Sequence, residues 1–365
     1  MAVVALDARL TRQMSVGMKS YVRELVARVP RHAPGLEFLV FGNEPFEKLD
    51  ANASFRPVGE RVARNGGLGE QIAFPRLLER SGADLVHHMS VYAPRKARYP
   101  HVYTIHDLIH LRFPRYFSWK VPPYYKLIVG PVARSSRMVI TDAQATVADL
   151  HALLHVPLDR VRVVPLGATE AFALDEPERI VRAARAAQRF GLERPYFIYA
   201  GNHRPHKNIQ TLVEAWRMTQ GACDLVLTEE GPFGFELASG KKTNGRILAL
   251  GRISQEDLIN LYAGCAGAVQ PSLYEGFGLG ALEAMCAGAP VIVARTQALL
   301  ELVGSASLTF GPHDGPELAR HMDALLADPA LAQRLRNAGR SRARDFSWER
   351  TAQLTAAVYH EALAC

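Results

Sequence analysis

Two glutamates, Glu275 and Glu283, border a glycine-rich stretch whose residue types suit the binding of a phosphorylated sugar. The stretch reads EGFGLGALE, with glycines at 276, 278 and 280, and it continues into a helix-forming sequence. Glycine lets the backbone approach a ligand, and the first N–H groups of a helix, with its dipole, favour an anion such as a diphosphate. Glu275 is expected on the loop and Glu283 about one turn into the helix, so they can accept hydrogen bonds from different hydroxyls of one extended ligand. Two glutamates without this context would indicate only surface residues.

A second segment with candidate ligand-binding residues reads YAGNHRPHKN and spans residues 199–208. It again places a glycine, Gly201, between an apolar, strand-like run and a helical pattern. Lys207 offers a point charge that suits a phosphate, and Arg204 can make bidentate contacts with one. The alternative is an ordinary helix start that carries surface cations.

A third candidate, His106, follows the strand-like run 101–105 and precedes Asp107. Ligands of open α/β sheets bind at the carboxyl ends of the strands, so His106 is predicted to face a cleft. A lone histidine in a tight loop is more often structural, because its ring readily satisfies backbone groups.

The elements that would position these residues form a repeated pattern along the chain. Short β-branched runs alternate with helical stretches, which indicates βαβ units and parallel sheets covered on both faces. The predicted strands of the first series span residues 3–6, 37–41, 85–88, 101–105, 138–141 and 161–164, and those of the second span 196–200, 224–228, 247–250, 267–270 and 291–294. The fold class is therefore α/β, with two Rossmann-like doubly wound parallel-sheet domains and a cleft between them.

The two series set the predicted domain boundaries. Residues 1–175 form the N-terminal Rossmann-like domain, and residues 176–345 form the C-terminal one, which a charged helix over 176–189 introduces. Residues 346–365 are predicted to form a last helix, capped by Ser347, that packs back on the N-terminal domain.

Composition limits the classes of partner and compartment. The 365 residues carry a net charge of +7, which favours an anionic partner such as a nucleotide phosphate or a membrane surface. No zinc-ligand spacing or RNA-recognition motif accompanies the charge, so nucleic acid is not expected as a partner. No apolar run reaches the roughly 20 residues of a membrane span, and the apolar N-terminus is too short for a signal peptide. The four cysteines are scattered, which favours a reducing, cytoplasmic location.

The candidate segments together resemble the donor-site signature of the retaining GT-B glycosyltransferases of family 4 type, also called glycosyl transferases group 1. The resemblance rests on Glu-Gly-Phe-Gly after a serine and an aromatic residue, on seven residues between the glutamates, and on AGAPVI over 287–292. It extends to TIHDL over 104–108 and to VVPLG over 163–167. It implies transfer of a hexose from a nucleotide-diphosphate sugar, with retention of anomeric configuration and without a metal ion or other cofactor. Mannosyl or glucosyl transfer to a glycan, lipid-linked or small-molecule acceptor in cell-surface polysaccharide synthesis is favoured.

The resemblance also assigns roles. Glu275 would bind the sugar hydroxyls, Glu283 the ribose hydroxyls, and Lys207 with a second basic group the diphosphate. His106 would contact the transferred sugar, with Asp107 orienting its loop. The predicted catalytic residues are His106, Lys207 and Glu275. The predicted donor-binding residues are Gly17, Gly201, Arg204, His206, Lys207, Gly251, Arg252, Ile253, Glu275, Gly276, Phe277, Gly278, Leu279 and Glu283, with no metal ligands.

The chain departs from the family pattern at several positions. Proline is common where Gly280 stands, so the start of this helix is expected to be looser. The arginine expected near the lysine is missing, and its role passes to His206 or Arg204. Lys19 stands where a second glycine is usual in the loop around Gly17. These departures keep open the alternative of a nucleotide-sugar binding subunit without catalysis. A nucleotide-sugar 2-epimerase is a second alternative, because it has the same fold and binds the same kind of ligand.

The acceptor is expected to bind the N-terminal domain, where residues 111–129 interleave four cations with six aromatic residues. This composition suits a membrane interface or a lipid-diphosphate acceptor, and it predicts peripheral membrane contact through 111–129. Ordinary packing of a long loop and helix explains it as well.

Overall fold

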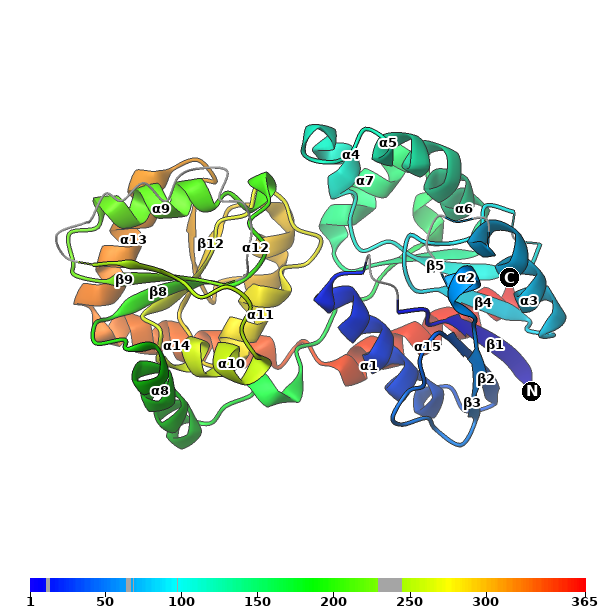
Figure 1. The fold of residues 1–365 in the computed structure, drawn as a ribbon, viewed down its shortest axis with the longest axis horizontal. Helices are drawn as coiled ribbons and strands as arrows, with labels where there is room; N and C mark the ends of the chain where they lie inside the picture. The colour runs from blue at the N-terminus through cyan, green and yellow to red at the C-terminus, as the bar shows by residue number, and fades with distance from the viewer. Residues whose placement is uncertain (11–13, 64–66, 68, 97, 229–244) are drawn as a thin grey trace. The chain divides into compact units, whose positions relative to one another are not determined.

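The computed structural model describes residues 1–10, 14–63, 67, 69–96, 98–228 and 245–365. The chain divides into two compact units, each built on its own parallel sheet (Figure 1). The first unit comprises Met1–Gly167 and Trp348–Cys365, and the second comprises Ala168–Ser347. The structure thus divides the chain between Gly167 and Ala168, whereas the sequence pattern placed the boundary at residue 175.

The first unit contains a seven-stranded parallel sheet of order β3-β2-β1-β4-β5-β6-β7 in its described residues. The strand order reverses beside β1, so the carboxyl ends of β1 and β4 form the point where doubly wound sheets bind ligands. The strands are β1 (Ala2–Asp7), β2 (Leu36–Gly42), β3 (Ala53–Pro57), β4 (Leu85–His88), β5 (His101–Thr104), β6 (Met138–Thr141) and β7 (Val161–Val163).

The second unit contains a six-stranded parallel sheet of order β10-β9-β8-β11-β12-β13 among the residues described. Its order reverses beside β8, which makes the ends of β8 and β11 the corresponding ligand-binding edge. The strands are β8 (Tyr196–Tyr199), β9 (Asp224–Leu227), β10 (Ile247–Ala249), β11 (Gly267–Gln270), β12 (Val291–Ala294) and β13 (Leu308–Phe310).

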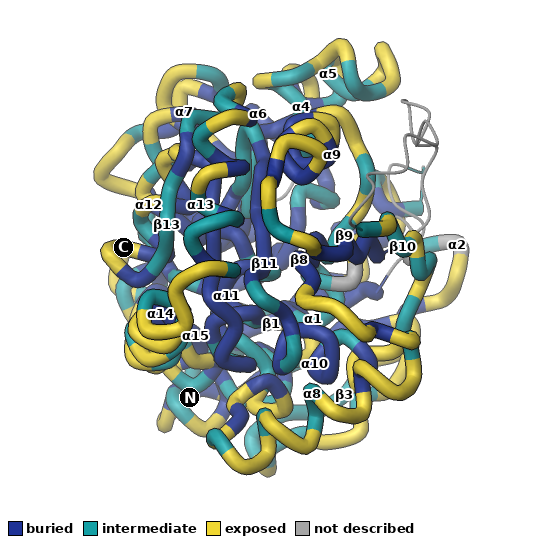
Figure 2. Tube along the Cα trace, turned by 90° about the vertical axis from the view of Figure 1, so that its left-hand side faces the viewer, coloured by how far each residue is buried: buried dark blue, intermediate teal, exposed yellow. Residues whose placement is uncertain are grey.

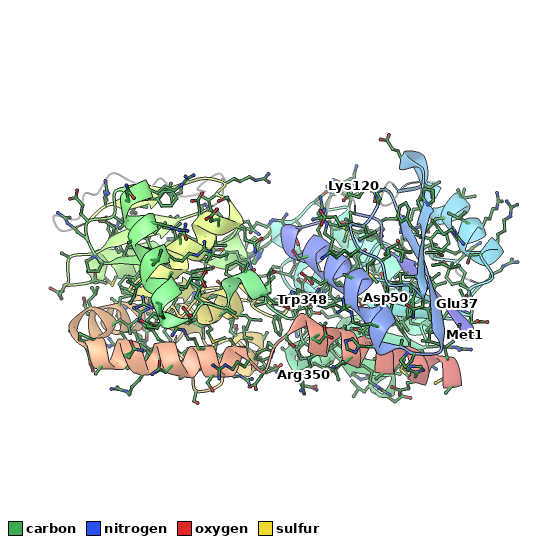
Figure 3. The ribbon with its side chains drawn as sticks, turned by 90° about the horizontal axis from the view of Figure 1, so that it is seen from below. Met1, Glu37, Asp50, Lys120, Trp348 and Arg350 are labelled. Carbon is green, nitrogen blue, oxygen red and sulfur yellow. The ribbon has the colours of Figure 1, made fainter. Side chains whose placement is uncertain are left out.

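Helices cover both faces of the first sheet, and α1 and α15 lie together on one face (Figure 1, Figure 3). Ser15 caps α1, because its side chain accepts a hydrogen bond from the Met18 amide. The C-terminal α15 belongs to this unit, and its Tyr359 hydroxyl lies 2.6 Å from Nδ1 of His87 on β4. The helices are α1 (Val16–His32), α2 (Glu60–Ala63), η1 (Gly69–Ala73), α3 (Phe74–Arg80), α4 (Ile109–Arg112), η2 (Pro114–Tyr116), α5 (Val121–Tyr124), η3 (Tyr125–Val129), α6 (Gly130–Ser135), α7 (Gln144–Leu154), η4 (Leu158–Arg160) and α15 (Trp348–Ala364).

The second sheet is also covered on both faces, with α9 and α13 on one and α8, α10 and α14 on the other (Figure 1). Asp175 caps α8, and Gly191 ends it in the left-handed conformation. The helices are η5 (Glu170–Phe172), α8 (Glu176–Phe190), η6 (Pro205–Lys207), α9 (Ile209–Met218), α10 (Gln255–Gly264), α11 (Leu279–Cys286), α12 (Gln297–Val303), α13 (Gly315–Ala327) and α14 (Pro329–Ala343).

Buried apolar side chains from the strands and the inner helix faces form the cores (Figure 2). Trp216 and Phe197 are central in the second unit, and Tyr103 and Ile105 are central in the first. No helix in the described parts of the chain combines the length and apolar character that crossing a bilayer requires.

The structure confirms the predicted α/β class with two parallel sheets and adds two strands, β3 and β13. Both lie at a sheet edge, and their short sequences carry few fully buried residues. Because an edge strand pairs on one side only, it does not need the continuous apolar run by which central strands were identified.

Candidate functional site

The predicted donor residues of the second unit gather at the carboxyl ends of β8 and β11. Gly201 follows β8 with a φ of 145°, and its amide donates to Thr228 Oγ1 at 3.3 Å. The Leu273 amide after β11 donates to the His206 carbonyl at 2.8 Å, which joins the two loops. The sequence pattern therefore brings Lys207 and Glu275 together, although 68 positions separate them.

Lys207 and Glu275 form an ion pair in which Nζ lies 2.7 Å from Oε1. Gln270 Nε2 donates to the same carboxylate oxygen at 2.7 Å and to Ser272 Oγ at 3.1 Å. Burial raises the pKa of Glu275, but the Lys207 charge and these hydrogen bonds outweigh it and leave the pKa below its usual value. Glu275 is thus a fixed carboxylate. The orienting role of Gln270 was missed from the sequence, because nothing marks a strand-end glutamine as an orienting group.

The loop between Glu275 and α11 depends on Gly278, which has a φ of 104° at the helix start. A Cβ there would stand 2.6 Å from Leu299, so both backbone conformation and space require glycine. The Phe277 side chain is buried and packs edge-on against Phe346, with ring centroids 5.7 Å apart. Phe277 and Leu279 can therefore offer a ligand their backbone amides at the N-terminus of α11.

Glu283 lies in the second turn of α11, where burial raises its pKa to about 8. A carboxyl group in this state is a receptive site for hydroxyl donors, because hydrogen bonds to the carboxylate offset its desolvation. The pKa of Glu275 on the loop is thus lowered, whereas the pKa of Glu283 on the helix that follows is raised.

The two candidates for a second basic group differ in exposure. The His206 residue is 3% exposed and lies within the η6 turn, whereas Arg204 is exposed. A buried ring cannot easily reach a diphosphate, so the geometry favours Arg204. Asn208, which the sequence did not indicate, adopts φ 56° and donates to the carbonyls of Pro271 and Pro312 at 3.0 and 2.6 Å.

The remaining predicted donor residues lie in two other segments. Gly251, with φ 64°, follows β10, with Arg252 exposed and Ile253 half-buried. Gly17 lies in the first turn of α1 in the first unit. The contribution of these two segments to donor binding remains a prediction.

His106 of the first unit is held by Asp142, a residue that the sequence reasoning missed. Its Nδ1 lies 2.8 Å and 3.1 Å from the two carboxylate oxygens, and the Tyr21 ring packs edge-on at 4.7 Å. Burial lowers the pKa of His106, but Asp142 outweighs burial and raises it above its usual value. Asp107 has a local role, because its carboxylate accepts from the Ile109 amide at 2.9 Å.

The pairing register of β5 and β6 explains why Asp142 lies beside His106. Strands β5 and β6 pair with Thr104 opposite Ile140, so positions 106 and 142 are equivalent two residues beyond the paired strands. An aspartate and a histidine also meet on β1 and β4, where Asp7 pairs with His88 in register and its carboxylate accepts a hydrogen bond from the His88 ring at 2.9 Å.

A buried ionic cluster lies at the ligand-binding edge of the first sheet. Arg9 binds Asp7 through Nε and Nη2 at 2.6 and 2.8 Å, and its Nη1 lies 3.4 Å from Glu70. The same guanidinium donates to the Tyr92 carbonyl at 3.1 Å. Burial raises the pKa of Asp7, but Arg9 outweighs it and leaves the pKa at about 2. This cluster fixes the loops that follow β1 and β4.

The described residues contain no group of three or more histidine, cysteine, aspartate or glutamate side chains placed to hold a metal ion. The predicted donor residues of the second unit offer backbone amides, the cations of Lys207 and Arg204, and two glutamates, which are groups that suit a diphosphate sugar.

Two family descriptions match the chain. Residues 181–342 match "Glycosyl transferases group 1", and residues 16–171 match "Glycosyltransferase Family 4". The O-antigen chain mannosyltransferase B of Escherichia coli is 28% identical over 77% of this chain and 75% of its own length. The MMP alpha-(1->4)-mannosyltransferase of Mycolicibacterium hassiacum is 32% identical over 64% of this chain, and the match spans 56% of that relative.

Solved structures with the same fold cover the whole chain. A sucrose-phosphate synthase from Thermosynechococcus elongatus superposes with a TM-score of 0.76 at 22% identity, covering 100% of both chains. HepE from Anabaena, solved in complex with UDP and glucose, superposes with a TM-score of 0.71 at 18% identity, covering 99% of this chain and 100% of its own. The family matches and the two parallel-sheet units agree, and the chain belongs to the family 4 type glycosyltransferases with the GT-B fold.

Proposed function

We propose that this glycosyltransferase moves a hexose, with mannose favoured, from a nucleotide-diphosphate sugar to a glycan, lipid-linked or small-molecule acceptor in cell-surface polysaccharide synthesis. The observation that carries the proposal is the Lys207–Glu275 pair beside the start of α11. It puts a cation, backbone amides and a fixed carboxylate at the ligand-binding edge of one sheet. The mannosyltransferase relatives support the choice of sugar.

In this proposal the residues of the second unit bind the donor. The Glu275 carboxylate accepts hydrogen bonds from the sugar hydroxyls, and Glu283 accepts them from the ribose. The amides of Phe277–Leu279 and the Lys207 ammonium stabilise the charge that develops on the nucleotide diphosphate as the sugar departs. Arg204 supplies the second basic group. HepE has been solved with UDP and glucose, and a nucleotide ligand of this kind is proposed for this chain.

In the first unit, His106 contacts the transferred sugar. The Asp142 carboxylate accepts a hydrogen bond from the His106 Nδ1–H, which orients the ring. Transfer is proposed to retain the anomeric configuration, with the acceptor attacking from the face that the nucleotide leaves and a donor phosphate oxygen taking the acceptor proton. The reaction is proposed to need no metal ion.

Peripheral membrane contact through residues 111–129 belongs to the same proposal. Trp119 is 78% exposed and Leu127 is 54% exposed. Lys120 lies over the Trp119 ring at 5.6 Å. No aspartate or glutamate occurs from residue 108 to residue 141, whereas six lysines and arginines do. An exposed aromatic and aliphatic pair within a purely cationic segment suits an anionic lipid surface that presents a lipid-linked acceptor.

Product analysis tests the proposed activity. The protein is incubated with GDP-mannose or UDP-glucose, with and without mannose-terminated oligosaccharides. The products are then separated and identified by mass spectrometry. The expected result is an acceptor lengthened by one hexose together with free nucleoside diphosphate, with the anomeric configuration of the new bond given by NMR. Quantitative conversion of the donor alone into an epimer would instead establish the epimerase alternative.

A further inference from the structure

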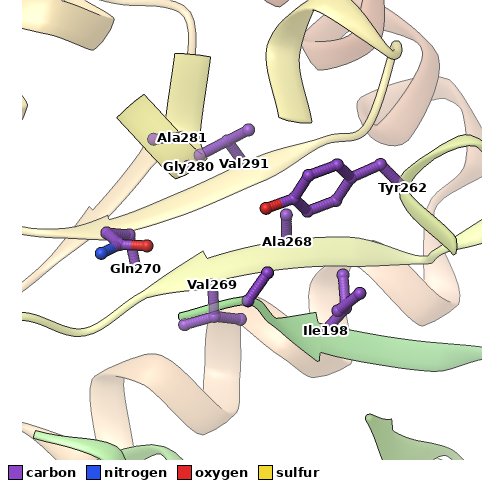
Figure 4. A pocket seen from close by; sticks show the side chains of 9 residues that line it. Ile198, Tyr262, Ala268, Val269, Gln270, Gly280, Ala281 and Val291 are labelled. Carbon is purple, nitrogen blue, oxygen red and sulfur yellow. The ribbon is translucent and has the colours of Figure 1, made fainter. Parts of the chain in front are cut away.

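A small cavity lies beneath the first turn of α11, in the core of the second unit (Figure 4). Its volume, measured for the centre of a water molecule, is about 10 Å³. The cavity exists because Gly280 has no side chain at this point. Its lining residues are Ile198, Ala200, Tyr262, Ala268, Val269, Gln270, Gly280, Ala281 and Val291.

Three polar atoms converge on this otherwise apolar cavity. A Cβ built on Gly280 would stand 3.6 Å from the Ala200 carbonyl oxygen, 3.7 Å from Gln270 Oε1 and 3.7 Å from the Tyr262 hydroxyl. Figure 4 shows the Gln270 oxygen and the Tyr262 hydroxyl pointing toward one another across the space. One donor and two acceptors therefore meet around a single position.

A buried water needs a site of about 10–15 Å³ by this measure and two to four polar partners, whereas apolar cavities of similar size remain dry. The cavity meets both conditions. We propose that Gly280 creates a structural water site, in which the water accepts from the Tyr262 hydroxyl and donates to the Ala200 carbonyl and to Gln270 Oε1.

The water site is connected to the donor site through Gln270. The amide of Gln270 is 7% exposed, and its Nε2 donates to Glu275 Oε1 and to Ser272 Oγ. With the water bonded to Oε1, both ends of the amide are anchored, and the Nε2 hydrogen bonds keep their direction. Through Gln270 the water thereby helps to hold the Glu275 carboxylate in position. This consequence rests on the proposed donor-binding role of Glu275, whereas the water site itself does not.

The same geometry explains why a side chain at position 280 would matter. An alanine methyl group would fit, because contacts of 3.6–3.7 Å are ordinary. It would take the place of the water and leave Tyr262, Ala200 and Gln270 without their shared partner. Buried polar groups that lose a partner destabilise the folded state, even where the added methyl group favours the helix.

Crystallography of the unmodified protein tests the site directly. An ordered water within hydrogen-bonding distance of all three polar atoms is expected, and its density is expected to vanish in Gly280→Ala. A dry cavity in a well-resolved structure would overturn the proposal.

Binding measurements test the connection to the donor site. Isothermal titration with whichever of GDP-mannose and UDP-glucose the unmodified protein binds is expected to show affinity weakened by about threefold to tenfold in Gly280→Ala and in Tyr262→Phe. Matched controls are Gly315→Ala, where a Cβ meets nothing closer than 3.9 Å, and Tyr196→Phe, which loses a hydrogen bond to the Leu261 carbonyl. Both controls are expected to keep the affinity, although Tyr196→Phe lowers the melting temperature.

The outcomes separate the two claims. Equal affinities for Gly280→Ala and Gly315→Ala would refute the support of Glu275 by the water. Failure of the unmodified protein to bind any nucleotide sugar would overturn the proposed function, while the crystallographic result would still decide the water site.

Discussion

Replacing Lys207 by methionine is expected to destabilise the second unit by about 2 kcal/mol at neutral pH. Its Nζ lies 2.7 Å from Glu275, and the two side chains are only 16% and 12% exposed. Removing one partner of a fully buried pair costs about 3–5 kcal/mol, and the hydrogen bonds from Gln270 to Glu275 reduce that cost here. For a unit of this size, about 2 kcal/mol corresponds to a melting temperature lower by about 4–8 °C.

The pH dependence of this loss distinguishes an unpaired carboxylate from a general packing defect. In the unmodified protein the pKa of Glu275 lies below its usual value, so the stability that Glu275 contributes is present above the unfolded-state pKa of 4.5 and is lost as pH falls through the folded-state pKa. Without Lys207, burial dominates and raises the pKa of Glu275. The loss in Lys207→Met is therefore expected to be largest near pH 8 and to shrink toward pH 5, where the carboxyl group takes up a proton.

Calorimetric melting temperatures from pH 5 to pH 8 provide the assay. The double variant Lys207→Met/Glu275→Gln is expected to recover much of the loss at pH 8, because it leaves no buried charge. Arg295→Met, which breaks the exposed pair with Glu317, serves as the control and is expected to change little. A Lys207→Met loss that is equal at pH 5 and pH 8 would refute the reasoning.

Three further predictions concern other sites. Glu283→Gln is expected to raise the melting temperature, by an amount that grows from pH 5 to pH 8. The reason is that burial raises the pKa of Glu283 to about 8, whereas the unfolded chain releases the same proton more readily. An equal gain at every pH in calorimetry would contradict this. Asp142→Asn is expected to lower the pKa of His106, measured by NMR titration of its ring nitrogens, far more than Asp107→Asn does. Equal shifts in the two variants would show that Asp142 is not the main group that raises this pKa. Trp119→Ser is expected to reduce sedimentation of the protein with phosphatidylglycerol vesicles several-fold. The melting temperature is expected to stay the same, because the ring is exposed. Unchanged sedimentation would argue against membrane contact through residues 111–129.

Local sequence signals were sufficient for the central strands of the two sheets and for the loops that carry the predicted donor residues. Central strands such as β8 and β12 are buried along their whole length, and each forms a short apolar run that stands out from its neighbours. Glu275, Gly278 and Lys207 follow such strands closely, so their place at the carboxyl edge could be inferred from chain order alone.

The partners of these residues could not be inferred in the same way. Asp142 and His106 meet because β5 and β6 are neighbours in register, and the sequence reasoning did not fix that register. Gln270 orients Glu275 only because the loop after β11 turns back on its own strand. The inward position of His206 likewise follows from the short η6 turn, which sequence spacing did not reveal.

A thermal-shift panel of GDP, UDP, ADP and dTDP with their common sugar conjugates tests the proposed donor site most directly. A ligand that binds only the native state raises the melting temperature by mass action. At least one nucleotide sugar is expected to raise it for the unmodified protein, and Glu275→Ala and Lys207→Ala are expected to abolish most of that rise. No shift with any member of the panel, or a shift that both variants retain, would overturn the proposal that the Lys207–Glu275 pair forms the donor site.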